Sequence, residues 1–210
     1  MMERRSFLSR FSVVAAALGL ARPADAAAAT GGFDPSRHPQ DDWFDQLPGK
    51  HRVVFDTWSA DKFDDAIRFS NNIFRGNKDG YDLTEKDLAV IIIARHRTAP
   101  FAYNDAMWAK YGKAFSERME FVDPKTKEAP TKNPYGTQLA ALVKQGVHLG
   151  ICNLTTKSYA QRLGELTGRP ADEVYKEITS NTVGNGHFVP AGVVGATRAQ
   201  EHGYALVSIG

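Results

Sequence analysis

The sequence predicts an α/β fold: a single compact three-layer domain with a mostly parallel five-stranded sheet and helices on both faces. Short apolar segments typical of strands alternate with longer segments of helical periodicity, which is the pattern of parallel strands joined by helices. Residues 88–94, with the sequence LAVIIIA, are continuously apolar and rich in β-branched side chains, as expected of a central strand covered on both faces. The 210 residues, 42% of them apolar, suffice for one core.

The N-terminus is expected to be an export signal over residues 1–26. An apolar run at 11–20 is too short to span a bilayer, and Ala-Asp-Ala at 24–26 is typical of a cleavage site. Arg4 and Arg5, followed by Ser-Phe-Leu, resemble the twin-arginine export motif, which implies a bacterial periplasmic protein exported after folding. An ordinary signal peptide, which exports the chain unfolded, can also carry two arginines and remains the alternative.

Residues 27–49 are expected to form an N-terminal arm, because glycines and prolines are scattered among polar residues there. Trp43 and Phe44 should fix this arm to the body of the protein, since two aromatic rings left in water would waste apolar burial. The domain itself is expected over residues 50–210.

Within the domain, strands and helices are expected to alternate in order. The five strands should lie near residues 53, 90, 149, 188 and 206, with helices over 59–76, 103–115, 137–144, 155–166 and 192–202 and another helical segment around 174–178. Gly76 should end the first helix, which leaves residues 77–87 as a polar loop. Residues 116–135 interrupt the alternation with several prolines and lysines, and they predict an inserted loop.

The charge of the chain argues against two classes of partner. The net charge of +2 comes from 26 basic and 24 acidic residues, so neither nucleic acid nor a membrane surface is expected to bind it. After removal of the signal, no apolar segment is long enough for stable membrane insertion.

Cys152 is the only cysteine, and the sequence places it at the carboxyl end of a short buried strand that leads into a helix capped by Thr155 or Thr156. Ligands and reacting groups collect at that end of open α/β sheets, and a helix N-terminus favours a thiolate. A single cysteine in an exported protein cannot form an internal disulfide. It is therefore reactive, paired with another molecule, or hidden in the core as free cysteines often are.

Three basic residues, Arg95, His96 and Arg97, follow the predicted central strand directly. The carboxyl ends of parallel strands share one rim, so these side chains are candidates to border Cys152, favour its thiolate and bind anionic substrates. The alternative is a solvated basic loop.

Metal or cofactor binding is not expected. His148, His187 and His202 could join a lone cysteine in a copper or zinc site, but no spacing matches a metal motif and histidines so placed are more often structural. No nucleotide-binding glycine motif is present either.

Three C-terminal segments resemble the DsrE/DsrF-like family, which is related to sulfur relay: GVHLGICNLT at 146–155, FVPAGVV at 188–194 and QEHGYA at 200–205. The resemblance implies a parallel α/β fold, a homo-oligomer, and a persulfide on Cys152, the residue that matches the family cysteine. A protein that donates or accepts sulfur would be its partner. The 116–135 insertion and the export signal depart from the cytoplasmic sulfur carriers of that family.

The sequence thus favours an exported sulfur-handling protein in which Cys152 carries persulfide sulfur to a partner, possible enzyme classes being a sulfurtransferase or a sulfur carrier. One alternative is a noncatalytic subunit that binds a small ligand or a protein on the same fold. Another is a redox role in which Cys152 forms a mixed disulfide.

Overall fold

The computed structural model describes residues 34–210, and residues 38–210 form one compact unit. The predicted signal at 1–26 and the start of the arm, up to residue 33, lie outside the described residues. Five strands build a single sheet: β1 (His51–Thr57), β2 (Leu88–Ala94), β3 (His148–Cys152), β4 (Gly186–Val189) and β5 (Ala205–Ile209). Their order is β4-β3-β2-β1-β5 and every pairing is parallel, which confirms the predicted fold class.

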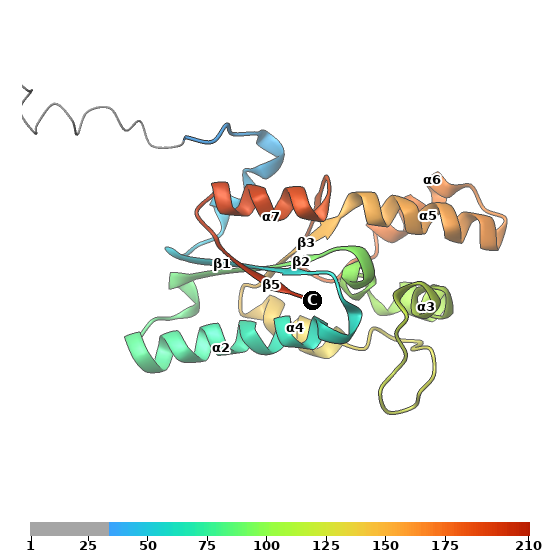
Figure 1. Ribbon diagram of the computed structural model, residues 1–210, viewed down its shortest axis with the longest axis horizontal. Helices are drawn as coiled ribbons and strands as arrows, with labels where there is room; N and C mark the ends of the chain where they lie inside the picture. Colours follow the sequence, from blue (N-terminus) through green and yellow to red (C-terminus); the bar gives the residue numbers. More distant parts are fainter. Residues whose placement is uncertain (1–33) are drawn as a thin grey trace, which may run out of the picture. The chain divides into compact units, whose positions relative to one another are not determined.

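The central strand β2 is buried along its whole length because helices cover both faces of the sheet. One face packs against α2 (Phe63–Tyr81) and α4 (Gly136–Lys144), and the other against α7 (Gly192–Glu201) (Figure 1). Val90 and Ile92 point into the larger core cluster, whereas Ile91 and Ile93 point into the smaller one beneath α7. The two-residue period of a strand thus explains why LAVIIIA has no polar side.

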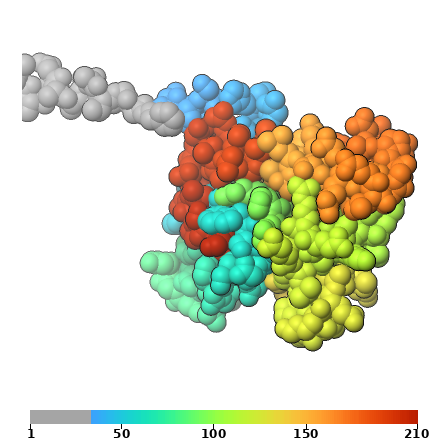
Figure 2. Space-filling view, turned by 45° about the vertical axis from the view of Figure 1, so that its right-hand side comes forward, coloured from blue at the N-terminus to red at the C-terminus, as the bar shows by residue number. Residues whose placement is uncertain are grey.

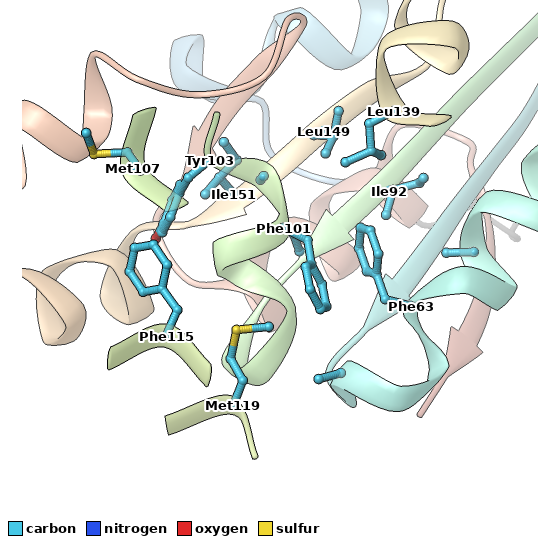
Figure 3. Packing of buried hydrophobic residues seen from close by; sticks show 14 of the residues in the cluster. Phe63, Ile92, Phe101, Tyr103, Met107, Phe115, Met119, Leu139, Leu149 and Ile151 are labelled. Carbon is cyan, nitrogen blue, oxygen red and sulfur yellow. The ribbon is translucent and has the colours of Figure 1, made fainter. Parts of the chain in front are cut away.

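A further group of helices lies beyond the carboxyl ends of the strands: α3 (Asp105–Met119), α5 (Asn153–Thr167) and α6 (Ala171–Thr179) (Figure 1). Their apolar sides join the larger core cluster. Phe63 and Phe101 lie against each other with ring centroids 4.8 Å apart, and Tyr103 packs beside Phe115 at 5.7 Å (Figure 3). No helix within residues 34–210 has the length and apolar character needed to cross a membrane.

The arm is held by its aromatic residues, as the sequence predicts. Phe44, in the short helix α1 (Trp43–Gln46), is fully buried in the cluster beneath α7, and Trp43 stacks on His187 with ring centroids 4.0 Å apart. The remaining short helices are of the 3-10 type: η1 (Pro39–Asp41), η2 (Ala60–Lys62), η3 (Glu85–Asp87) and η4 (His96–Ala102).

Two predicted helix ends are wrong. The helix α2 continues past Gly76 to Tyr81 and is followed by Asp82, a C-cap residue in the left-handed conformation with φ 56°. Gly76 is exposed with open space where a side chain would stand, so it weakens the helix without ending it. The helix α3 runs on to Met119 and takes up the first residues of the expected insertion, so the loop itself covers 120–135.

The inserted loop is packed closely against α3 at Gly112, where a Cβ atom would lie 2.0 Å from the carbonyl oxygen of Pro130. Gly112→Ala is therefore expected to lower the free energy of unfolding by about 1–3 kcal/mol, the usual range for overpacking, in spite of the better helix propensity of alanine. Chemical denaturation measures the change. The matched control is Gly76→Ala, with no atom within 4 Å, which should stabilise the protein by about 0.5–1 kcal/mol. A stabilised Gly112→Ala would contradict the packing.

Candidate functional site

Cys152 is the last residue of β3 and also the residue that caps the N-terminus of α5. Its sulfur accepts hydrogen bonds from the backbone N–H of Thr155, at 3.5 Å, and from the Thr155 hydroxyl, at 3.2 Å. The prediction that Thr155 or Thr156 caps the helix is wrong, because the helix begins directly after the strand and the thiol occupies the position of a capping serine. Both donors and the helix N-terminus favour negative charge on sulfur.

Arg95 lies at the same rim, but its guanidinium group is bonded to Asp56, with distances of 2.6 Å from Nε and 2.9 Å from Nη2. Its stem lies over the start of α7, where a Cβ on Gly192 would be 2.3 Å from the Arg95 Cβ. The hydrogen bond to Asp56 raises the pKa of Arg95, burial opposes the shift, and Cys152 is close enough to add a smaller raising effect. The structure therefore brings Arg95 near Cys152 and pairs the guanidinium group of Arg95 with the carboxylate of Asp56.

His96 and Arg97, the other two basic residues predicted to border Cys152, have different contacts. The backbone N–H of His96, a residue with φ 52°, donates to the Thr155 hydroxyl at 3.3 Å, so the loop after β2 is tied to the residue that binds the thiol. Arg97 forms a two-pronged ion pair with Glu120, at 2.7 and 2.6 Å. Because Thr155 accepts from His96 and donates to Cys152, it joins the basic loop to the sulfur.

A cavity of about 150 Å³ adjoins Thr155 on the outer side of this site; its lining residues are His96, Arg97, Arg118, Thr155 and Tyr159. Arg118 from α3 and Tyr159 from α5 were not among the residues predicted from the sequence. The spacing of Thr155 and Tyr159, four residues apart, was the available signal, since it places both on one side of a helix that starts at Cys152. Two larger hollows, of about 810 and 580 Å³, share no residue with this cavity.

Two of the three singled-out histidines meet on the face covered by α7. His148 Nδ1 and His187 Nε2 are 2.8 Å apart, and burial lowers the pKa of both rings, that of His187 to about 4. His202 lies apart from them, with Nδ1 2.9 Å from Asp45 Oδ2. Within the described part of the chain, no three His, Cys, Asp or Glu side chains gather so as to hold a metal ion.

The comparisons with known proteins do not bear on function. The chain matches no protein-family model and no curated protein. Among solved structures it is similar to a protein of unknown function from Methanobacterium thermoautotrophicum, with a TM-score of 0.45 and 16% sequence identity, over 76% of this chain and 99% of that one.

Proposed function

We propose that this chain handles sulfane sulfur, with Cys152 taking it up as a persulfide and passing it to a partner. The observation that supports this most directly is the pair of hydrogen bonds from Thr155 to the Cys152 sulfur at the start of α5. Donors aimed at a sulfur stabilise the thiolate, which is the form that attacks and leaves in sulfur exchange. The resemblance to the DsrE/DsrF-like family points in the same direction.

The proposed chemistry needs no external oxidant or reductant. The Cys152 thiolate attacks the terminal sulfur of a donor persulfide, R–S–SH, so that a new sulfur–sulfur bond forms at Cys152 while the old one breaks. The bonding electron pair leaves with the donor as R–S⁻, and the proton stays on the transferred sulfur. Attack by an acceptor thiolate on Cys152–S–SH repeats the step in reverse and restores the Cys152 thiolate.

The proposed setting rests on the export signal that the sequence predicts and on the resemblance to the DsrE/DsrF-like family. The chain would act in the periplasm as a homo-oligomer, and a second protein would supply or receive the sulfur. Nucleic acid and membrane are not proposed as partners, since the charge is nearly balanced.

One observation favours a different candidate function. Cys152 is only 5% exposed, and a sulfur so enclosed suits a structural thiol in a noncatalytic subunit that binds a small ligand or a protein. The two candidates differ in a measurable property. A carrier must present its sulfur in the folded state, so iodoacetamide should modify Cys152 in the native protein; a structural thiol should react only after unfolding.

Thr155→Val tests whether the hydroxyl of Thr155 serves the thiolate. The substitution keeps the backbone donor and the size of the side chain but removes the 3.2 Å hydrogen bond to sulfur. Hydrogen bonds to charged groups contribute about 1.5–3 kcal/mol, so native alkylation near neutral pH should slow by about tenfold or more. Thr155→Ser should restore the rate, and the free energy of unfolding measured alongside should separate this effect from general loosening. An unchanged rate in Thr155→Val would remove the main support for the carrier.

A further inference from the structure

We propose that the cavity beside Thr155 is a binding site for a small sulfur oxyanion, with thiosulfate as the class of substrate that delivers sulfur to Cys152. This inference rests on the proposed function for the transfer step, but not for the binding itself. The cavity is formed where α3, yellow-green in Figure 2, and α5, light orange, meet near the carboxyl ends of the strands.

Positive charge dominates the walls of the cavity. Arg97 and Arg118 both line it, and Arg162, one turn beyond Tyr159 on α5, lies close enough to act on the Tyr159 hydroxyl. Within residues 34–210, Glu120 is the carboxylate that forms an ion pair with a lining residue; it bonds Arg97, and its side chain is 67% exposed. Asp61 also lies close enough to Arg97 for the two charges to attract each other. The positive charges thus exceed the negative charge at this place, although the chain as a whole is nearly neutral.

A buried donor without a partner also lines the cavity. Tyr159 is 1% exposed, and its hydroxyl has no hydrogen-bond partner among the described residues. Burial raises the pKa of Tyr159 to about 12, although the charges of Arg118, Arg97 and Arg162 oppose the shift, so this hydroxyl keeps its proton. Native proteins rarely leave such a donor unpaired, and an anion between Tyr159 and the arginines would satisfy it.

Arg118 has the geometry of a side chain held for a ligand. Its guanidinium group lies over the Tyr159 ring, 4.3 Å from the centroid, and Nη2 donates to the hydroxyl of Ser158 at 2.8 Å. These contacts are to neutral groups, and no carboxylate pairs with Arg118 among the ion pairs formed within residues 34–210. A fixed guanidinium group whose charge is not neutralised is well suited to bind an oxyanion.

Size and position define the ligand further. About 150 Å³ is below the roughly 300–1,000 Å³ of typical cofactor and drug sites, so the cavity suits a small inorganic anion. Thr155 separates the cavity from Cys152, with its hydroxyl 3.2 Å from the sulfur. An anion that carries a transferable sulfur next to its oxyanion group matches both features, and thiosulfate is the simplest such species.

The transfer from thiosulfate balances without a further reactant. The Cys152 thiolate attacks the outer sulfur of thiosulfate, a bond forms between the two sulfurs, and the sulfur–sulfur bond of thiosulfate breaks. The electron pair leaves with sulfite, SO₃²⁻, and Cys152 retains the transferred sulfur as a deprotonated persulfide. The leaving group is itself a dianion, which the arginines of the cavity stabilise as it forms.

Binding is tested apart from chemistry on the Cys152→Ser protein, by calorimetric titration with sodium sulfate and with sodium thiosulfate at constant ionic strength. Both anions should bind, and Tyr159→Phe and Arg118→Gln should each weaken binding by about tenfold or more, since each loses a donor to a charged ligand. Tyr159→Phe keeps the ring and should fold at least as stably, because it removes only an unpaired hydroxyl. Arg75→Gln, an exposed arginine on α2, is the control and should bind as the parent does.

Absence of binding to the Cys152→Ser protein, or binding that neither variant weakens, would overturn the inference. Failure of the proposed function has a different signature. If polysulfide adds sulfur to wild-type Cys152 while neither sulfate nor thiosulfate binds, the proposed sulfur carriage is supported and the proposed oxyanion site is refuted. If sulfate binds as described but neither polysulfide nor thiosulfate adds sulfur to Cys152, the proposed oxyanion site is supported and the proposed sulfur carriage is refuted.

Discussion

Replacing Asp56 with Asn is expected to destabilise the domain and, at the same time, to make Cys152 react faster with iodoacetamide. Asp56 is buried and accepts two hydrogen bonds from Arg95, whose side chain is 22% exposed. Loss of one partner of a buried ion pair costs about 3–5 kcal/mol, and the partial exposure of Arg95 brings the expected loss to about 2–3 kcal/mol. The guanidinium charge, no longer neutralised, then favours the thiolate of Cys152.

Replacing the other partner of the pair, Arg95, distinguishes the effect of charge on Cys152 from the effect of lost stability. Arg95→Met also removes the pair and should destabilise the protein, yet it should slow alkylation of Cys152, because the positive charge near the sulfur is gone. For each variant, chemical denaturation gives the free energy of unfolding, and reaction with iodoacetamide in the native state gives the alkylation rate of Cys152. If Asp56→Asn and Arg95→Met change the alkylation rate of Cys152 in the same direction, the reactivity of the thiol depends on loosening of the structure around it and not on the charge of Arg95.

Acid should weaken the contact between the arm and the sheet. His148 and His187 share a 2.8 Å hydrogen bond beneath Trp43, and burial lowers the pKa of both rings. A histidine whose folded-state pKa is lowered binds protons more readily when unfolded. Its stabilising effect is therefore complete above the unfolded pKa of about 6.5 and is lost as the pH falls toward the folded value of about 4 for His187.

The size of the acid effect is set by two opposing contributions. The lowered pKa of His187 corresponds to a loss of up to about 3 kcal/mol in the free energy of unfolding. Stacking on Trp43, with an interplanar angle of 3°, would return about 0.5–2 kcal/mol to a charged ring through cation–π attraction. The expected net loss between pH 6.5 and 4 is therefore about 1–2.5 kcal/mol.

Denaturation at a series of pH values, followed by tryptophan fluorescence, measures this loss. His187→Phe keeps a flat ring against Trp43 and cannot be protonated, so it should flatten the pH dependence; His38→Gln, at an exposed histidine, should leave it unchanged. A His187→Phe protein that loses as much stability in acid as the parent would rule out the histidine pair as the cause.

The sheet was predictable because its strands depend on local composition. The composition of LAVIIIA predicted a strand covered on both faces, and the rule that the carboxyl ends of parallel strands share one rim placed the end of β2, which precedes Arg95, beside the end of β3 at Cys152. The ends of α2 and α3 were not predictable from glycine or from the loop composition, since an exposed Gly76 is tolerated inside a long helix and the residues after 115 continue one.

The details of the site depend on contacts between distant elements, which sequence patterns do not record. Nothing local indicates that Arg95 is bonded to Asp56 from β1, or that Arg118 from α3 lies over Tyr159 from α5. The capping of α5 was mistaken for a related reason: a threonine is the usual cap, and only the direct passage from β3 into the helix gives that place to Cys152.

Sulfur carriage by Cys152 is tested most directly by the intact mass of the purified protein after incubation with polysulfide. If Cys152 carries sulfur, the folded wild-type protein gains the mass of one or more sulfur atoms; a thiol reductant removes this gain, and Cys152→Ser does not show it. A wild-type mass that does not change, together with a thiol that reacts with iodoacetamide only after unfolding, would contradict sulfur carriage and leave Cys152 as a buried structural residue.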